Sequence, residues 1–314
     1  MRRPASRRRR VRREILPCLP VPHLGRQVGA RRDGFLHVRL RRRSVTARRP
    51  IILVGAGRMG SALAKGWCAA GLGPRLIIIE PSPSSALRAL KRKGARINPK
   101  ARDLAAMNPE AIVLAVKPQM MEAVTPAYAP PARSALVLSI AAGISLSSLA
   151  RLFGRDAAIV RAMPNLPASV GQGITAAVAA PSLTMRQKSL ATRLLAAGGE
   201  VVWVRREAWL DPVTAVSGSG PAYVFLLAEA LAKAGREQGL PAALSDQLAR
   251  ATVIGSGALL GLSADDPRAL RDSVTSPGGT TAAALSVLLE GGGFQDLMSR
   301  AIAAATLRSR ALGK

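Results

Sequence analysis

The spacing of apolar residues changes character near residue 50. Beyond that point, short apolar runs typical of strands alternate with stretches that are helical or loop-like. The strands are predicted at 51–54, 75–80, 111–116, 135–140, 157–162, 173–178 and 200–204. Such alternation predicts an α/β fold with a mostly parallel, doubly wound sheet. We assign this first folded domain to residues 48–209.

The strand pattern ends after Trp203, and from Asp211 onward the pattern is helical. The helices are predicted at 221–238, 241–261, 265–274, 280–290 and 294–312. They are apolar nearly all round, and such helices must be buried against something. A helical unit of this size has too little interior to bury that surface alone. We therefore predict that residues 210–314 form an all-helical domain that dimerises with a second copy of the chain.

Residues 1–47 form an Arg-rich extension without a sustained apolar period. The first fifty residues contain 17 Arg against only Glu14 and Asp33. A segment of this kind cannot bury enough surface to offset its chain entropy, so we expect disorder. Three origins stay open: a basic arm for nucleic acid, an organelle-targeting segment, or a stretch absent from the native protein and added by an upstream start assignment.

Charge and cysteine content narrow the class of protein. The first fifty residues contribute +15 of the net charge of +28, and the remaining 264 residues carry 29 basic and 16 acidic side chains. That balance is ordinary for an enzyme with anionic ligands, so we expect no nucleic-acid partner. The cysteines, Cys18 and Cys68, provide neither a disulfide framework nor a metal-ligand cluster, which favours a cytoplasmic protein without a metal site. The uncharged stretch 212–228 is interrupted by small polar residues and is shorter than the roughly 18 to 20 apolar residues of a membrane span, so no membrane association is expected.

A glycine-rich turn follows the first strand and opens a helix. In the segment 55–60, Gly55 permits the tight turn, Gly57 lets a pyrophosphate approach the backbone N–H groups, and Gly60 lets the helix pack closely on the strand. The positive end of the helix dipole then faces the phosphates. This pattern indicates a Rossmann-type dinucleotide-binding domain, although a structural turn without a ligand would have the same spacing.

The second strand ends in an acidic residue, Glu80, 25 residues after Gly55. An acid at this position usually accepts hydrogen bonds from the ribose hydroxyls and selects NAD. The donors that follow, Ser82 and its neighbours with Arg88, would instead suit the 2′-phosphate of NADP. The expected cofactor is therefore NADPH or NADH.

Three short loops after later strands are expected to face the cofactor, because ligands of open α/β sheets lie beyond the carboxyl ends of the strands. They are Lys117–Gln119, Ala141–Gly143 and Met163–Asn165. Each of them would also serve as a plain turn, and Lys117 as a solvated residue at the end of a strand.

Two further loops in the helical part are rich in small residues and lie just before helices. One covers 214–225 with the sequence TAVSGSGPAYVF, and the other covers 270–281 with the sequence LRDSVTSPGGTT. Both present N–H and hydroxyl donors at a helix N-terminus, which suits a carboxylate.

With GAGRMG, AVKPQ, MPN, SGSGPAYVF and VTSPGGTT in this order, the chain resembles the pyrroline-5-carboxylate reductase family across residues 50–314. The resemblance implies NAD(P)H-dependent reduction of the cyclic imine 1-pyrroline-5-carboxylate to L-proline. It also implies a homo-oligomer, either a dimer or a decameric ring of dimers. Arg58 departs from the Asn that many members of the family have in the glycine turn.

The resemblance further implies the site residues. The catalytic residue would be Thr281, whose hydroxyl would bond the ring nitrogen. The substrate-binding residues would be Thr275, Ser276, Gly279 and Thr280, with the Ser276 hydroxyl and the N–H groups of residues 279–281 on the carboxylate. The cofactor-binding residues would be Gly55, Gly57, Arg58, Met59, Gly60, Glu80, Ser82, Ala115, Val116, Lys117, Pro118 and Asn165.

The residues that are missing also favour an imine substrate. The only histidines, His23 and His37, lie in the extension. Dehydrogenation of an alcohol usually needs a base such as His or a tuned Lys, whereas a protonated imine accepts hydride without one. Thr281 would then stabilise or supply the proton on nitrogen, unless its hydroxyl only caps the helix.

Two other functions match parts of the pattern. A β-hydroxyacid dehydrogenase shares the two-domain plan, as would another imine reductase, but the dehydrogenases need a catalytic Lys where this chain has Tyr223 and Phe225, and Lys233 comes roughly three helical turns later. A non-catalytic nucleotide-binding or nucleic-acid-binding protein would leave the donor-rich loop at 274–281 without a purpose.

Overall fold

An eight-stranded sheet lies at the centre of the first domain in the computed structural model, which describes residues 49–100 and 107–313. The strand order is β3-β2-β1-β4-β5-β6-β7-β8. The strands are β1 (Ile51–Val54), β2 (Leu76–Ile79), β3 (Arg96–Ile97), β4 (Ala111–Leu114), β5 (Leu136–Ser139), β6 (Ala158–Met163), β7 (Gly173–Ala179) and β8 (Gly199–Trp203). The predicted disorder of residues 1–47 lies outside the described residues.

The pairing confirms the predicted mostly parallel sheet. Ile51 in β1 pairs with Leu76 in β2 and Ala111 in β4, both in parallel register. The β6–β7 pair is antiparallel, and the other pairs are parallel. The carboxyl ends of β1, β2, β4, β5 and β6 therefore meet at one edge of the sheet, where the sequence places the glycine turn.

The predicted strands are confirmed to within about two residues at each end. The sequence pattern missed β3, which has only two residues and begins with the exposed Arg96. A strand this short gives no apolar run to detect.

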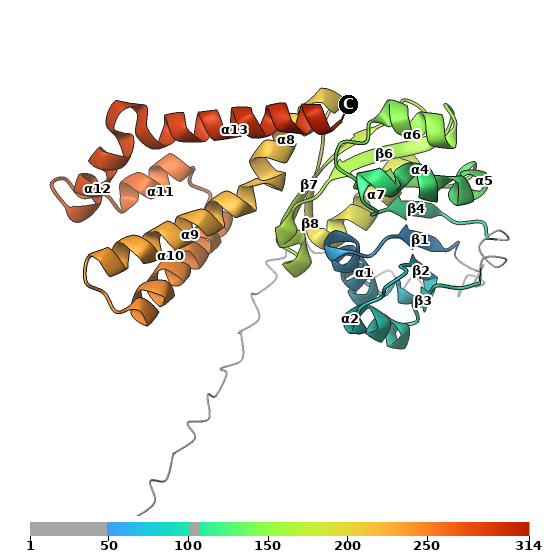
Figure 1. The fold of residues 1–314 in the computed structure, drawn as a ribbon, viewed down its shortest axis with the longest axis horizontal. Coiled ribbons are helices and arrows are strands. Elements are labelled where there is room, and N and C mark those ends of the chain that lie inside the picture. The colour runs from blue at the N-terminus through green and yellow to red at the C-terminus, as the bar shows by residue number, and fades with distance from the viewer. Residues whose placement is uncertain (1–48, 101–106, 314) are drawn as a thin grey trace, which may run out of the picture. The chain divides into compact units, whose positions relative to one another are not determined.

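The two faces of the sheet carry separate hydrophobic cores. Alternate residues of β1 point to opposite faces, as the period of a strand requires: Ile51 and Leu53 belong to one core, and Ile52 and Val54 to the other. The first core is covered by α1 (Arg58–Ala69) and α7 (Met185–Leu195), and the second by α4 (Met121–Val124), α5 (Ala129–Ala132) and α6 (Leu146–Phe153) (Figure 1). The remaining short helix here is α2 (Ser85–Arg88).

Short 3₁₀ segments connect many of these elements. They lie at Gly73–Arg75, Ala89–Lys93, Pro118–Met120, Thr125–Tyr128, Leu166–Val170, Ala196–Gly198, Glu207–Trp209 and Glu290–Gly292.

The chain after the sheet is helical, as predicted. Its helices are α8 (Leu210–Val213), α9 (Gly220–Glu237), α10 (Ala242–Leu262), α11 (Pro267–Ser273), α12 (Thr280–Leu289) and α13 (Gly293–Leu312), with a π-helical turn at Thr214–Gly218. The buried Ser245 hydroxyl of α10 donates to the carbonyl oxygen of Ala232 in α9 at 2.7 Å, which fixes these two helices side by side. The described residues form one compact unit, so the boundary between 209 and 210 stays a prediction.

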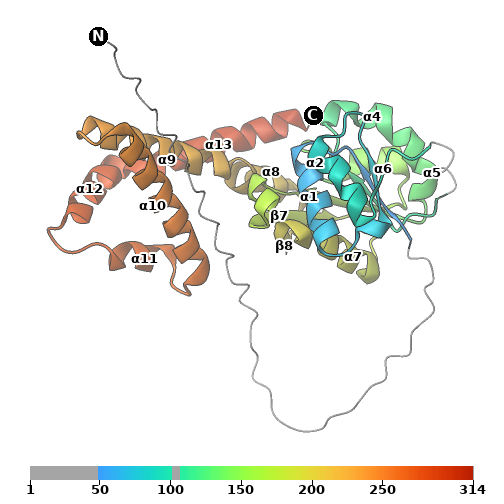
Figure 2. The ribbon, with the colours of Figure 1, turned by 90° about the horizontal axis from the view of Figure 1, so that it is seen from below.

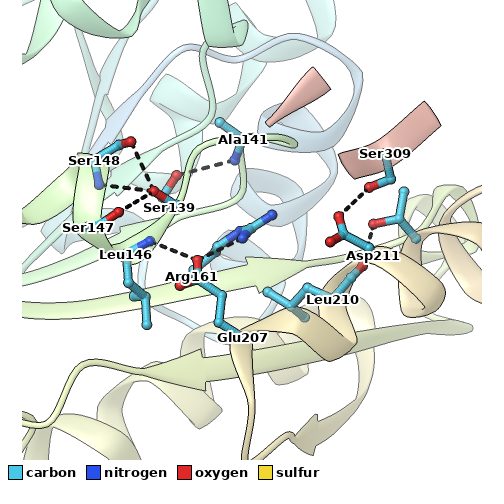
Figure 3. Close-up of polar contacts among 12 residues, drawn as sticks. Ser139, Ala141, Leu146, Ser147, Ser148, Arg161, Glu207, Leu210, Asp211 and Ser309 are labelled. Atoms are coloured by element: carbon cyan, nitrogen blue, oxygen red, sulfur yellow. Dashed lines mark hydrogen bonds and ion pairs between the residues drawn. The ribbon is translucent and has the colours of Figure 1, made fainter. Parts of the chain in front are cut away.

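Polar contacts fasten the helical part to the sheet (Figure 3). Glu207 accepts hydrogen bonds from Arg161 of β6 and from the backbone N–H of Leu146, at 2.7 and 2.8 Å. Asp211 of α8 accepts a hydrogen bond from the Ser309 hydroxyl of α13 at 2.7 Å. The C-terminal end of α13 lies beside the sheet (Figures 1 and 2), where the carbonyl oxygen of Leu312 approaches Gly143 in the loop after β5.

Candidate functional site

The glycine turn after β1 is held by close backbone contacts. Gly55 has φ +83°, and a Cβ atom added there would be 2.8 Å from the carbonyl oxygen of Ala115. A Cβ added at Gly60 would be 2.5 Å from the carbonyl oxygen of Gly55. Only glycine satisfies both positions, so the structure gives Gly55 and Gly60 the roles that their spacing predicts.

The middle glycine of the turn faces open space. A Cβ atom added at Gly57 would have no atom within 4 Å, and Gly57 is the N-cap of α1 without a side-chain cap. The first turn of α1 also contains no acidic residue. An uncapped helix N-terminus with free space in front of it suits a pyrophosphate, because the orphan N–H groups and the helix dipole both attract anions. The residues present therefore fit a dinucleotide.

The end of β2 lies next to this turn. Glu80 accepts a hydrogen bond from the backbone N–H of Ala56 at 2.7 Å through one carboxylate oxygen and from the N–H of Ser82 at 3.1 Å through the other. Asn98, which sequence reasoning missed, bonds both backbone groups of Glu80. An Asn just after a strand was its only signal in the sequence.

The residues after β4 join the same region. Ala115 contacts the glycine turn, since its Cβ would lie 3.1 Å from a Cβ at Gly60. Val116 is half-buried, Lys117 is exposed, and Pro118 begins the following 3₁₀ turn. The structure thus brings the predicted residues of β1, β2 and β4 together at the carboxyl edge of the sheet.

Asn165 lies after β6 at the same edge and is buried. Its side-chain oxygen accepts a hydrogen bond from the N–H of Ile174 at 3.0 Å, which ties the start of β7 to the end of β6. It also lines an apolar cavity of about 880 Å³ together with Ser217 and Tyr223. The loop at 214–225 therefore borders the carboxyl edge of the sheet through Asn165. The π-helical turn within this loop is of a kind often found at functional sites.

The predicted substrate loop lies before α12. The Thr275 hydroxyl donates to the carbonyl oxygen of Arg271 at 2.7 Å, and the Gly279 N–H donates to the carbonyl oxygen of Ser276 at 3.0 Å. The first turn of α12 has neither a side-chain cap nor an acidic residue. The N–H of Gly279 is thus engaged within the turn, and the N–H groups of Thr280 and Thr281 are the ones placed to receive a carboxylate.

The structure does not bring this loop to the glycine turn of the same chain. Helix α12 packs on α13 and lies with α11 at the end of the helical part away from the sheet (Figure 1). Within the described ranges, no hydrogen bond links 274–281 to residues 49–209. One chain therefore contains both halves of the predicted site but does not join them.

Large apolar side chains are exposed along these helices. The most exposed include Phe225, Leu226, Ile254, Val287 and Leu307, at 59 to 70%. The segment Glu207–Glu237 is long and apolar enough by composition to span a membrane, and little of its most apolar part is buried within the chain. The uncharged stretch considered in the sequence ends at Ala228, so the sequence pattern did not reveal this longer segment. An apolar surface of this extent requires a covering partner or an apolar solvent.

Other ionisable groups lie away from the site. Burial raises the pKa of the Cys68 thiol, with Lys93 opposing the shift, and burial also raises the pKa of the Tyr128 hydroxyl. Cys68 belongs to the core on one face of the sheet, and Tyr128 belongs to the core on the other face. Within residues 49–100 and 107–313, no group of three His, Cys, Asp or Glu side chains is arranged to hold a metal ion.

Two family models match the chain. Residues 207–312 match pyrroline-5-carboxylate reductase dimerisation, and residues 50–143 match NADP oxidoreductase coenzyme F420-dependent. The first of these matches favours a second subunit as the partner that covers the apolar helices.

Known proteins resemble almost the whole described chain. A pyrroline-5-carboxylate reductase of Synechocystis is 42% identical over 264 residues, which cover 83% of this chain and 97% of that protein. The structure of the enzyme from Coxiella burnetii is 35% identical with a TM-score of 0.78, covering 85% of this chain and 99% of that one. The Plasmodium falciparum structure, which has NADP bound, is 31% identical with a TM-score of 0.72, covering 85% and 98%. The chain belongs to the pyrroline-5-carboxylate reductase family.

Proposed function

We propose that the protein reduces 1-pyrroline-5-carboxylate to L-proline with NADH or NADPH. The observation that carries this is the pairing of two anion sites of different kinds in one chain. The uncapped N-terminus of α1 with the open position at Gly57 suits the cofactor, and the uncapped N-terminus of α12 suits a small carboxylate. The likeness to the reductases of Synechocystis and Coxiella burnetii supports the same activity.

The cofactor, when bound, supplies the hydride. The chain supplies the rest: Gly55, Gly57 and Gly60 shape the turn that receives the pyrophosphate, and Glu80 lies where the ribose hydroxyls are expected. Ala115–Pro118 and Asn165 border the same edge. Arg58 and Met59 stand in the first turn of α1, where Arg58 is exposed and adds a positive charge beside the phosphates.

The substrate carboxylate is held by the loop before α12. Ser276 offers an exposed hydroxyl, and Thr280 and Thr281 offer N–H groups at the positive end of the helix dipole. The half-buried Thr281 hydroxyl bonds the ring nitrogen and keeps the proton there. A protonated imine needs no further base, so the main contributions of the protein are alignment and the exclusion of water.

A second subunit completes the site. Within one chain the loop before α12 does not reach the glycine turn. The exposed apolar faces of α9, α10 and α12 need to be covered by a partner. The substrate loop of one subunit therefore serves the cofactor of the other. We extend this to a decameric ring of dimers as the resting assembly, located in the cytoplasm and independent of membranes and nucleic acid.

The experiment follows the oxidation of NADH and of NADPH with 1-pyrroline-5-carboxylate, using the full chain and a chain that begins at residue 48. Both should form proline at similar rates, and sedimentation should show an assembly larger than a monomer. Loss of activity on removing residues 1–47 would contradict the assignment of the activity to residues 48–314. Oxidation of small hydroxy acids without proline formation would favour the β-hydroxyacid dehydrogenase alternative.

A further inference from the structure

The side chain of Asn98 clamps the backbone at the end of β2. The N–H of Glu80 donates to the Asn98 side-chain oxygen at 2.9 Å, and the Asn98 side-chain amide donates to the carbonyl oxygen of Glu80 at 2.8 Å. The Asn98 N–H also donates to the carbonyl oxygen of Ile78 at 2.8 Å. Asn98 thus continues the β2–β3 pairing with its side chain after β3 has ended.

The backbone of Asn98 has an unusual conformation. Its φ of +49° makes it the one non-glycine residue with positive φ among those the structure describes. Asn enters this left-handed region more readily than most residues, but the conformation is still uncommon and tends to occur where a specific geometry is required. Here it turns the chain back so that the side chain faces Glu80.

The clamp fixes the backbone from which the Glu80 carboxylate extends. With its backbone fixed, Glu80 places one oxygen 2.7 Å from the Ala56 nitrogen in the glycine turn and the other 3.1 Å from the Ser82 nitrogen. Both of these N–H groups are therefore engaged by the carboxylate.

This arrangement disfavours the binding of a 2′-phosphate. The N–H groups of Ala56 and Ser82 that would bind it are already engaged, and a carboxylate stands in its place. The nearby Arg88 donates to the carbonyl oxygen of Pro83 at 2.6 Å. Two negative groups at such short range repel each other strongly, whereas ribose hydroxyls can donate to the carboxylate.

We propose that Asn98 is a positioning residue for cofactor selection and that, by holding Glu80 against the glycine turn, it makes this chain prefer NADH to NADPH. The inference rests on the proposed reductase function for its kinetic readout.

The test compares kcat/KM for NADH and NADPH in the full-length protein and three variants. The unmodified protein should favour NADH by about tenfold or more. Asn98→Gly keeps the left-handed backbone accessible but removes the clamp, so the NADH-to-NADPH ratio should fall by about fivefold, through a higher KM for NADH. Asn98→Asp keeps the acceptor and loses the donor, so its ratio should lie between the two. Glu80→Gln should lower the ratio further than either.

Asn108→Gly is the matched control. Asn108 also accepts side-chain hydrogen bonds, from Arg49 and Ser134, but lies at the amino edge of the sheet before β4. It should leave the ratio unchanged. An NADPH preference in the unmodified protein, or a ratio that Asn98→Gly does not move, overturns the proposal.

Direct calorimetric binding of NADH and NADPH to the same variants separates this inference from the proposed function. If the protein fails to reduce the imine, the proposed function falls, while the ratio of the two dissociation constants and its dependence on Asn98 still decide the role of the clamp. A ratio that follows Asn98 without imine reduction would support the clamp alone.

Discussion

The carbonyl oxygen of Leu312, at the end of α13, lies against Gly143 in the loop after β5: a Cβ atom added at Gly143 would be 2.8 Å from that oxygen. Gly143 itself has φ +77°. This loop is one of the three expected to face the cofactor, so the C-terminal helix contacts the edge of the sheet where the cofactor is expected. The position of α13 is thereby linked to the geometry of the site.

Gly143→Ala should destabilise the protein for two reasons, backbone strain and collision with Leu312. We expect a loss of about 2–3 kcal/mol in the free energy of unfolding, measured by chemical denaturation. Gly171→Ala is the control, because Gly171 has φ +74° but nothing within 4 Å of an added Cβ. It should cost about 1 kcal/mol from strain alone. Equal losses in the two variants would show that contact with α13 contributes nothing.

Gly57→Ala should fold normally and bind the cofactor poorly. The added methyl meets no protein atom within 4 Å but occupies the space in front of the α1 N-terminus. The KM for the cofactor should rise about tenfold or more, with the free energy of unfolding changed by less than about 1 kcal/mol.

Gly55→Ala provides the contrast in the same turn. Its Cβ would be 2.8 Å from the Ala115 carbonyl oxygen, in a backbone with φ +83°. It should lower the unfolding free energy by several kcal/mol, about 2–4. If Gly57→Ala left cofactor affinity intact, the pyrophosphate would have to lie elsewhere.

Glu207→Asn should weaken the junction between the sheet and the helices. Glu207 accepts from both Arg161 and the Leu146 N–H, and the Arg161 and Glu207 side chains are only 12 and 29% exposed. Removing a charged acceptor from this partly buried position should cost about 1–2 kcal/mol in urea denaturation. Asp246→Ala breaks the more exposed pair with Arg236, at 63 and 39%, and should cost less than about 0.5 kcal/mol. A similar loss of unfolding free energy in both variants would contradict a specific stabilising role of Glu207.

Most of the fold could be predicted because it rests on local and periodic signals. The runs before Gly55 and Glu80 are uninterrupted apolar strands, and the helices after Asp211 begin and end at small-residue loops. The antiparallel pairing of β7 gave no such signal, since its direction depends on the way the loop tied by Asn165 returns the chain. The two-residue β3 was too short to produce a pattern.

The candidate site could be predicted where only glycine fits the backbone geometry. It could be predicted less well where the geometry depends on hydrogen bonds between loops. Gly55, Gly57 and Gly60 have the positions that their spacing requires. The sequence could not show that the Gly279 N–H is engaged by Ser276, nor that Asn98 clamps Glu80, because both depend on contacts fixed only once the loops have folded. The separation of the two halves of the site within one chain is likewise a matter of tertiary structure.

Thr281→Ala should separate proton handling at the ring nitrogen from binding of the carboxylate. The variant keeps the backbone N–H at the start of α12 and loses only the hydroxyl, so kcat/KM for the imine should fall by about 10² to 10³ while the KM for the cofactor stays constant. Thr281→Ser should restore most of the activity. Ser286→Ala, which removes an exposed hydroxyl bonded only to the Ala283 carbonyl on the same helix, controls for the loss of a hydroxyl as such and should leave steady-state turnover unchanged. A Thr281→Ala protein with normal turnover would remove that hydroxyl from the mechanism.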